Sequence, residues 1–336
     1  MRFLYPLRHL LIGTAAALCA AVTSHAAPQL QVGYMPIMPD AQTFVIAEGL
    51  TRHNPLAQAR LVMFQNGPEI VQALLSGQLD VAYVGSGPAM VARANGAEVR
   101  FVAGNTHGSA HVLALGNLAK YFTPGTTAAE AIARFAQEEG RKPRLTTFPV
   151  GSVPSASLQY WLRDQTKAGL DSVQIIYQGE NQVVQSLLTG AVDGTLSPDP
   201  AADIVLARKP DAKIVDEVTH GAAGAGLLVR EKLIQEQPEL VRALVQAHYE
   251  ASELLQKQPQ KAAVAVQKHI GGGRLPIAVI HAALQRATFD ADPRFLQRDT
   301  EALYEFQSSM GVFKKPLKVD DLFDTSFYNA VKGGQP

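Results

Sequence analysis

The feature that most constrains the fold is a segment that occurs twice at a fixed distance. Residues 69–89 read EIVQALLSGQLDVAYVGSGPA, and residues 182–201 read QVVQSLLTGAVDGTLSPDPA, 113 positions further on (182 − 69 = 113). Over the first twelve pairs, six residues are identical and four more are close substitutions. A repeat distance this long excludes a solenoid, whose periods run from about 20 to 50 residues. The repeat therefore predicts two similar lobes.

Each copy of the repeat predicts a helix, a strand and a turn into a further helix. Residues 70–75 place apolar side chains on one face at helical period, and Gly77 follows where a left-handed C-terminal cap favours glycine. Residues 79–84 read as a short strand, and residues 85–88 as a turn with Ser86 before the next helix. Free amides at such a helix start favour an anion, although the pattern also fits an ordinary α/β crossover.

Chain length and charge narrow the class of protein. The 336 residues are 47% hydrophobic and 18% charged, as in soluble globular proteins, and at this length two domains are the default. Residues 1–26 contain two arginines and no acids, so the chain without them carries 28 − 30 = −2 charges. This near-neutral balance supports neither nucleic acid nor an anionic membrane as partner.

The N-terminal residues 1–26 are predicted to be a signal peptide. Arg2 and Arg8 give a basic start, residues 10–22 form an apolar run, and small residues precede a cleavage site. The run is too short to span a bilayer. Cys19, the one cysteine, lies inside this segment in a context unlike a lipoprotein signal, so the mature chain would have no disulfide, thiolate metal site or cysteine nucleophile. We therefore expect a periplasmic protein without membrane insertion.

The order of predicted elements favours an α/β fold. Strands and helices alternate from residue 30 to residue 103, which predicts a mostly parallel sheet with ligand at the carboxyl ends of its strands. Helices are also predicted at 128–139, 156–164, 259–269 and 300–310 and a strand at 174–177, and beyond residue 238 nearly every segment reads as helix. Asp40 is a plausible N-cap for a helix at 41–50, and Trp161, at helical spacing with Leu158 and Leu162, is predicted to pack in the core. His107, His111 and His220 are the candidates for a metal or acid–base cluster, but they do not form a recognisable ligand set, so no metal and no cofactor is expected.

Five segments together resemble the periplasmic solute-binding proteins of taurine, alkanesulfonate and nitrate-type ABC importers. These segments are a strand ending in GYMP, PEIVQALLSGQLDVAYVGSGPA, TTFPVGSVPSASL, QSLLTGAVDGTLSPDPA and VDDLFDTSFY, and the likeness covers residues 28–330. The resemblance implies a type II periplasmic binding protein fold, in which two α/β lobes with mostly parallel sheets are joined by two hinge strands around a ligand cleft. Lobe 1 would comprise residues 28–107 and 222–336, and lobe 2 residues 108–221.

The resemblance also implies which residues contact the ligand. Its anionic head would lie against helix-start amides and hydroxyls, because neutral donors and helix dipoles can hold an anion without arginine. By position these residues are Tyr34, Met35, Gly85, Ser86, Asn105 and Thr106 in lobe 1, and Gly151, Ser152, Val153 and Asp199 in lobe 2. Many relatives have an aromatic residue or glutamate before proline where this chain has Ser-Pro-Asp-Pro at 197–200. Asp199 could bind a ligand amine or cap the following helix, and both readings stay open.

The expected function is that of a monomeric, non-catalytic receptor. It would bind a small organic anion, first of all a sulfonate such as taurine, an alkanesulfonate or an aromatic sulfonate, and deliver it to the transmembrane subunits of an ABC permease. Nitrate, an aromatic carboxylate or a pyrimidine or thiamine precursor are the alternative ligands. An enzyme on the same fold is the competing class, and it would need a histidine or acid–base cluster at the cleft.

Overall fold

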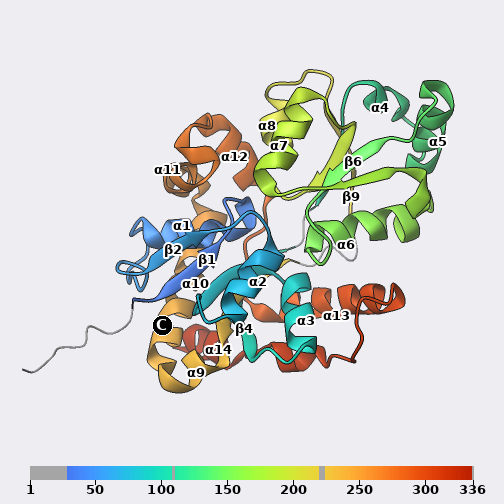
Figure 1. The fold of residues 1–336 in the computed structure, drawn as a ribbon. Helices are drawn as coiled ribbons and strands as arrows, with labels where there is room; N and C mark the ends of the chain where they lie inside the picture. Colours follow the sequence, from blue (N-terminus) through green and yellow to red (C-terminus); the bar gives the residue numbers. More distant parts are fainter. Residues whose placement is uncertain (1–28, 108–109, 219–223, 335–336) are drawn as a thin grey trace, which may run out of the picture.

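The fold consists of two five-stranded sheets with helices packed around each (Figure 1). The computed structural model describes residues 29–107, 110–218 and 224–334, so the predicted signal peptide and Cys19 lie outside the described residues. We call the half built on the first sheet lobe 1 and the half built on the second sheet lobe 2. The prediction of an α/β protein with two sheets of the periplasmic binding type is confirmed, whereas the residue numbers assigned to the lobe boundaries stay a prediction.

The sheet of lobe 1 is mostly parallel, with one reversed strand. Its order is β2 (Arg60–Met63), β1 (Gln31–Tyr34), β3 (Val81–Gly85), β10 (Ala225–Arg230) and β4 (Val99–Thr106). β1 is parallel to β2 and β3, while β10 is antiparallel to both β3 and β4. The reversed strand is therefore the one that the chain adds after it has completed the other sheet.

The sheet of lobe 2 has the same arrangement. Its order is β7 (Gln174–Tyr177), β6 (Arg144–Thr147), β8 (Gly194–Ser197), β5 (His111–Ala114) and β9 (Lys213–Glu217). β6 is parallel to β7 and β8, and β5 is antiparallel to β8 and β9. The chain passes between the lobes from β4 to β5 and again from β9 to β10, so each sheet receives its reversed strand directly from such a crossing.

The conserved spacing of the repeat has a structural cause at its aspartate. Oδ2 of Asp80 accepts a hydrogen bond from the amide of Gln31 at 3.0 Å, and Oδ2 of Asp193 accepts one from the amide of Arg144 at 2.8 Å. The two amides are also 113 positions apart. Each aspartate thus holds the start of the neighbouring parallel strand, β1 in lobe 1 and β6 in lobe 2, which explains why this residue is identical in both copies.

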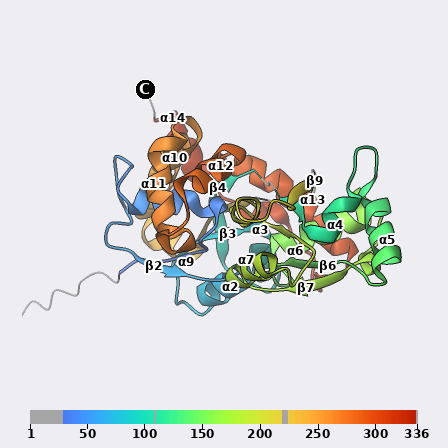
Figure 2. The same cartoon turned by 90° about the horizontal axis from the view of Figure 1, so that it is seen from above.

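The helices occur in two groups that cover the two sheets. In lobe 1 they are α1 (Ala41–Ala47), α2 (Gly67–Leu75), α3 (Ser86–Ala94), α9 (Glu231–Glu236), α10 (Pro238–Lys257), α11 (Pro259–His269), α12 (Ile277–Arg286), α13 (Pro293–Ser309) and α14 (Ser326–Gly333). In lobe 2 they are α4 (Gly116–Tyr121), α5 (Ala128–Glu139), α6 (Val153–Tyr160), α7 (Glu180–Thr189) and α8 (Ala201–Leu206). Figure 2 shows α10, α11 and α14 at one end of the molecule and α4 and α5 at the other.

Some helix boundaries differ from the sequence prediction. The helix predicted at 300–310 begins at Pro293, because Oδ1 of Asp292 accepts from the amide of Arg294 at 3.0 Å and caps an earlier start. The helix predicted at 156–164 begins at Val153 and continues after Tyr160 as a π-helical turn. Sequence periodicity locates the body of a helix better than its ends, where one side-chain bond decides the start.

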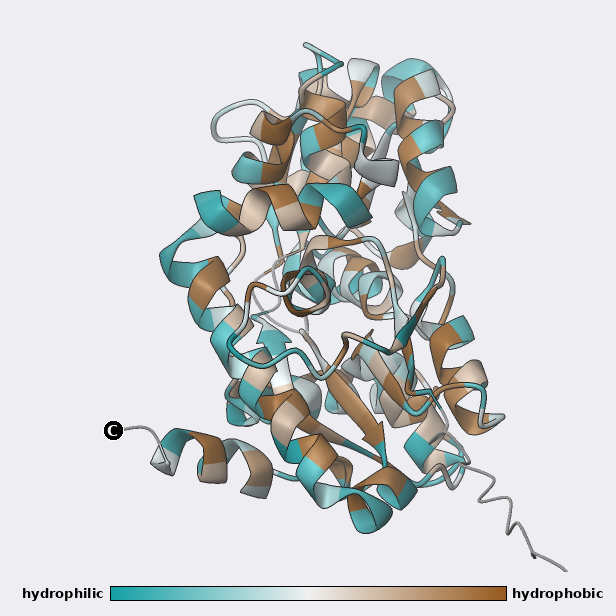
Figure 3. Ribbon diagram, turned by 90° about the vertical axis from the view of Figure 1, so that its left-hand side faces the viewer, coloured by the Kyte–Doolittle hydropathy of each residue, from teal (hydrophilic) through white to brown (hydrophobic). Residues whose placement is uncertain are grey.

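The apolar core follows the two sheets. Figure 3 shows hydrophobic strands covered by helices of mixed polarity, as expected for amphipathic elements on a buried sheet. Trp161 is 1% exposed in lobe 2, and its indole nitrogen donates to Oδ2 of Asp216 at 2.7 Å. The prediction that this tryptophan packs in the core is confirmed. Within residues 29–107, 110–218 and 224–334, no helix combines the length and apolar character that crossing a membrane requires.

Candidate functional site

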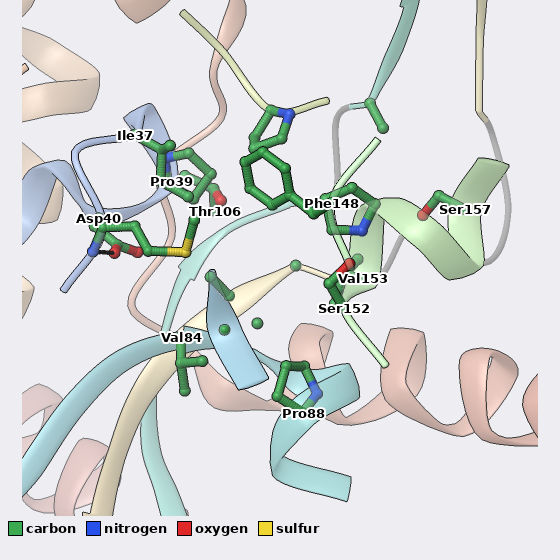
Figure 4. A pocket seen from close by; sticks show the side chains of 18 residues that line it. Ile37, Pro39, Asp40, Val84, Pro88, Thr106, Phe148, Ser152, Val153 and Ser157 are labelled. Atoms are coloured by element: carbon green, nitrogen blue, oxygen red, sulfur yellow. Dashed lines mark hydrogen bonds between the residues drawn. The ribbon is translucent and has the colours of Figure 1, made fainter. Parts of the chain in front are cut away.

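A small cavity lies between the two lobes (Figure 4). Its volume is about 80 Å³, whereas a cavity of about 150 Å³ holds benzene. The space therefore suits a ligand of only a few heavy atoms. Its walls are mostly apolar, with Met35, Ile37, Pro39, Val84 and Pro88 from lobe 1 and Phe148, Val153, Pro154 and Pro198 from lobe 2. The polar side chains in the lining are Asp40, Thr106, Ser152 and Ser157.

Two helix starts, one from each lobe, meet beside this cavity. A Cβ atom on Gly87, in the first turn of α3, would lie 3.2 Å from the carbonyl oxygen of Gly151 and 3.3 Å from the amide nitrogen of Val153, the first residue of α6. A Cβ atom on Gly85 would lie 2.8 Å from Cγ2 of Val153. Glycine at 85 and 87 thus lets the two N-termini approach closely at the interface between the lobes, and the N-terminus of a helix carries the positive end of its dipole.

Five of the ten predicted ligand-binding residues line the cavity: Met35, Gly85, Thr106, Ser152 and Val153. Ser152 is also the N-cap of α6, since its Oγ accepts from the amide of Ser155 at 3.3 Å. The structure therefore brings the end of β1, the start of α3, the end of β4 and the start of α6 to one place, although they are distant in the sequence.

Four predicted residues lie behind or beside this lining. Tyr34 packs edge-on against Phe44 at 5.4 Å between ring centroids, inside the core of lobe 1. Asn105 is fully buried, and its carbonyl accepts from Nε2 of Gln42 at 2.7 Å. Gly151 occupies the turn before α6 with φ at 89°. Ser86 is fully buried at the start of α3, and its hydroxyl has no hydrogen-bond partner among the described residues.

Asp199 contacts an arginine, whereas its predicted roles were contact with a ligand amine or capping of the following helix. Its carboxylate does not line the cavity: Oδ2 lies 3.6 Å from Nε of Arg286 on α12 and 3.9 Å from Nδ1 of His111. The N-cap of α8 is Pro200, and no side chain caps that helix. Arg286 belongs to lobe 1, so sequence reasoning on the local segment missed a contact that joins the two lobes.

Asp40 was predicted to cap α1 and instead lies in the cavity wall. Its side chain makes no capping bond to α1; Oδ2 accepts from the amide of Met35 at 2.7 Å, and Oδ1 has no partner among the described residues. The residue is 1% exposed, and this burial raises the pKa of its carboxyl group well above the ordinary value.

Phe148 is a second lining residue that the sequence prediction did not include. It follows β6 as Met35 follows β1, again 113 positions apart, and both side chains line the cavity. Extending the repeat toward the N-terminus of each copy would have revealed this pair. The pair shows that the two lobes contribute corresponding apolar residues to one cavity.

The lobes touch each other on more than one side of the cavity. Arg286 of α12 forms an ion pair with Asp203 of α8, beside Asp199. The amide of Met38 donates to the carbonyl of Asp199 at 2.8 Å, and the amide of Glu180 donates to the carbonyl of Gln65 at 3.1 Å. Figure 1 shows α12 beside α8 where the first of these contacts forms. The structure thus represents an arrangement in which the lobes contact each other beside the cavity.

The histidines do not assemble into one site. Nε2 of His107 lies 3.3 Å from Oδ2 of Asp290, whereas His111 faces Asp199, and His220 lies outside the described residues. No group of three or more histidine, cysteine or acidic side chains in the described ranges is arranged to hold a metal ion.

Comparison with protein families now adds to this geometry. The sequence matches the family model of the NMT1-like family over residues 24–269. The chain belongs to the NMT1-like family. No curated protein sequence is significantly similar to it. The match covers both copies of the repeat and both helix starts at the cavity.

Solved structures of the same fold are numerous and distant in sequence. The alkanesulfonate-binding protein SsuA from Xanthomonas axonopodis pv. citri bound to MOPS has a TM-score of 0.68 at 17% identity, with 89% of this chain and 98% of that chain covered. The periplasmic aliphatic sulphonate binding protein SsuA from Escherichia coli has a TM-score of 0.66 at 18% identity, covering 91% and 100%. The periplasmic nitrate-binding protein NrtA from Synechocystis PCC 6803 has a TM-score of 0.75 at 13% identity, covering 91% and 88%. The predicted resemblance to binding proteins of ABC importers is confirmed.

Proposed function

We propose that this NMT1-like protein is the periplasmic solute-binding component of an ABC importer. It binds a small organic anion between its lobes, with a sulfonate as the first candidate, and delivers it to the transmembrane subunits of the permease without catalysis. Similarity to two sulfonate-binding proteins and one nitrate-binding protein supports this class of ligand. The proposal includes the predicted lobe boundaries, the signal peptide at 1–26 and the monomeric state.

One observation carries the proposal: the starts of α3 and α6 meet at a small cavity between the lobes. The first amides of a helix have no partner inside the helix, and they carry the positive end of its dipole. Two such starts from opposite lobes attract an anion most strongly when the lobes are closed. Binding energy at the cavity is thereby linked to closure.

The two chain crossings supply the hinge for this motion. β4 leads into β5, and β9 leads into β10, so the lobes are joined by connections that lie next to the cavity residues Thr106, Ala110 and Ala225. Rotation about a few residues in the two crossings separates the lobes without unfolding either sheet. Release of the ligand would follow the reverse motion at the permease.

Thermal unfolding of the purified protein with each candidate ligand tests the proposed ligand class. The panel consists of alkanesulfonates, nitrate, aromatic carboxylates and pyrimidines, and a sulfonate at 100 times its dissociation constant should stabilise the fold by about 2.7 kcal/mol. If only nitrate or a carboxylate raises the melting temperature, the proposed sulfonate is wrong and the receptor function stands. Chemical conversion of any bound compound would show that the protein is an enzyme.

Ser86→Ala tests the anion site at the start of α3. The buried hydroxyl of Ser86 has no partner among the described residues, so its loss should weaken anion binding by about 1–3 kcal/mol with little change in the free energy of unfolding. Ser76→Ala is the matched control, because its hydroxyl bonds to the carbonyl of Ala73 in α2. Unchanged affinity in Ser86→Ala would show that the hydroxyl does not contact the ligand.

A further inference from the structure

The two repeated helices, α2 and α7, are capped differently at their N-termini. Asn66 is the N-cap of α2, and its Oδ1 accepts a hydrogen bond from the amide of Glu69 at 3.0 Å. The corresponding N-cap of α7 is Gly179 (179 − 66 = 113), which has no side chain that could accept from the first turn. The first amides of a helix have no partner inside the helix, and an N-cap side chain usually satisfies one of them. Lobe 2 therefore lacks the cap that lobe 1 has at the same position.

A residue of lobe 1 caps α7 instead. The carbonyl oxygen of Gln65 accepts from the amide of Glu180 at 3.1 Å, and Oε1 of Gln65 accepts from the amide of Asn181 at 3.3 Å. These are the first two amides of α7. Gln65 directly precedes Asn66 in the chain, so one short segment of lobe 1 caps its own helix through Asn66 and the helix of the other lobe through Gln65.

The glycine at position 179 is explained by this contact. Its backbone is extended, with φ at −73° and ψ at 165°, a conformation that any residue can adopt. A Cβ atom on Gly179 would lie 3.1 Å from Cβ of Gln65. The local conformation therefore does not require glycine at this position, whereas the close approach of Gln65 favours it.

The contact joins the sheet edges that are remote from the chain crossings. β2, which precedes Gln65, is the first strand in the order β2-β1-β3-β10-β4, and β7, which precedes α7, is the first strand in the order β7-β6-β8-β5-β9. The crossings connect β4 with β5 and β9 with β10, which lie toward the opposite edges. Rotation about the crossings displaces the remote edges most, so opening of the lobes breaks both hydrogen bonds of Gln65.

We propose that Gln65 is an interlobe helix cap that holds the lobes in the closed arrangement. This inference rests on the lobe motion of the proposed receptor and assigns one residue to its control. Gln65 does not belong to the cavity lining, so it acts on closure and not through contact with a ligand. When the lobes open, the amides of Glu180 and Asn181 exchange Gln65 for water, and the closed form loses the net stabilisation of these hydrogen bonds.

Disulfide trapping tests the contact in the ligand-free protein. Cysteines form a disulfide when their Cβ atoms lie about 3.5–4.5 Å apart, and the distance between the Cβ positions of residues 65 and 179 is 3.1 Å, a few tenths of an ångström below that range. Gln65→Cys combined with Gly179→Cys should therefore form an intramolecular disulfide under mild oxidation. Thiol titration and mass spectrometry of the cross-linked peptide measure it. The two single variants are the controls, because Cys19 is the one native cysteine. Absence of the cross-link overturns the inference.

Distances between two spin labels test whether the cap holds the lobes closed. The labels are attached to Arg60→Cys and Gln174→Cys, exposed positions at the starts of β2 and β7, in a Cys19→Ser background. Gln65→Met keeps the length of the side chain but removes its acceptor, so it should lower the ratio of closed to open protein about 2- to 10-fold.

Gln178→Met is the matched control. Gln178 corresponds to Gln65 at the repeat distance (178 − 65 = 113), and its Oε1 accepts from Oγ1 of Thr146 inside lobe 2 at 2.8 Å. This variant should leave the distances between the labels unchanged. An unchanged distribution of distances in Gln65→Met, or an equal shift in Gln178→Met, overturns the inference.

These measurements separate the inference from the proposed function, because they contain no ligand. If no compound of the ligand panel binds while Gln65→Met opens the lobes, the inference stands and the proposed ligand is wrong. If a sulfonate binds while Gln65→Met leaves the distances unchanged, the receptor function stands and the inference is wrong.

Discussion

The two copies of the repeat have the same structure through the helix and the strand, and they differ after the strand. In both, a helix ends at a glycine in the left-handed conformation, Gly77 with φ at 76° and Gly190 with φ at 72°. In both, the aspartate three residues later accepts from the first amide of a neighbouring strand: Asp80 from the start of β1 in lobe 1 and Asp193 from the start of β6 in lobe 2. Identity is therefore greatest where the residues build the sheet.

The copies differ after the strand. In lobe 1 Gly85 leads into a helix start that faces the cavity, whereas in lobe 2 Asp199 bonds through its carbonyl to Met38 and faces Arg286. The segment after the strand thus lies beside the cavity in one copy, and in the other copy it contacts lobe 1. The difference teaches that the same scaffold makes different contacts between the lobes at its two corresponding ends.

The largest expected effect comes from removing the shared aspartate. Asp193 accepts from Nη1 of Arg141 at 2.6 Å, from Nη2 at 2.7 Å and from the amide of Arg144, whereas Asp80 has the amide of Gln31 and a more distant arginine, Arg230 at 3.9 Å. Asp193→Ala should lower the free energy of unfolding by about 3 kcal/mol and Asp80→Ala by about 1.5 kcal/mol, with the exposed part of Arg141 discounted. Urea unfolding measures the loss of stability in each variant. Equal losses would mean that the ion pair of Arg141 with Asp193 does not contribute to stability.

The prediction of intermediate size concerns the first residues of the two repeated helices, α2 and α7, which differ. Gly67 begins α2, and Glu180 begins α7, where burial raises the pKa of its carboxyl group from 4.5 to about 7. The folded state then holds this proton more tightly than the unfolded state, so the contribution of Glu180 to stability is greatest below pH 4.5 and falls as the pH rises to about 7. Glu180→Gln should remove this fall and exceed the wild-type stability by about 2 kcal/mol at pH 8.

Urea unfolding at pH 5 and pH 8 measures this difference between Glu180→Gln and the wild-type protein. Glu69→Gln is the matched control, because Glu69 lies exposed in the first turn of the other repeated helix. A gain that is the same at both pH values would show that Glu180 is not protonated in the folded protein.

The smallest expected effect concerns the contact between the lobes. Arg286→Ala leaves Asp199 and Asp203 without their cation when the lobes close, although water can reach both when the lobes open; desolvation already raises the pKa of Asp203 to about 6. Closure becomes less favourable, and ligand affinity should fall about 10-fold, or about 1.4 kcal/mol. Titration calorimetry together with small-angle scattering measures affinity and closure.

Arg294→Ala is the control for this prediction, because Arg294 pairs with Asp292 inside lobe 1. It should leave both affinity and the scattering profile unchanged. If Arg286→Ala behaves like this control, the ion pair between the lobes does not hold the closed form, and the two copies of the repeat differ less than proposed.

Local sequence determined much of the fold. The helix at 128–139, the strand at 174–177 and the helix at 259–269 lie where the periodicity predicts them, and Gly77 ends its helix as its position after the apolar face predicts. These features depend on residues within a few positions of one another, which the sequence displays directly. The repeat added the pairing of the lobes, because its constant spacing records two copies of one unit.

Residues of the cavity wall could be predicted only where they follow a strand or lie at the start of a helix. Met35, Gly85, Ser152 and the other lining residues named in advance sit at such positions, and chain order suffices to place them. Phe148 corresponds to Met35 at the repeat distance of 113 positions, but it lies N-terminal to residues 182–201, where the second copy of the repeat is recognisable. Tyr34 ends β1 and Asn105 is the residue before the end of β4, yet neither lines the cavity: Tyr34 packs in the core of lobe 1, and Asn105 is fully buried. Chain order does not determine on which side of the backbone a side chain lies.

The roles of Asp40 and Asp199 were decided by tertiary structure alone. Both are aspartates near a helix start, where the sequence predicts a cap as readily as a ligand contact. Asp40 became part of the cavity because β1 and the turn after it bring the amide of Met35 to its carboxylate. Asp199 became a lobe contact because Arg286, 87 positions away (286 − 199 = 87), lies on the helix packed against α8. Burial and the choice of partner depend on residues that meet only in the folded chain, so composition and spacing cannot assign them.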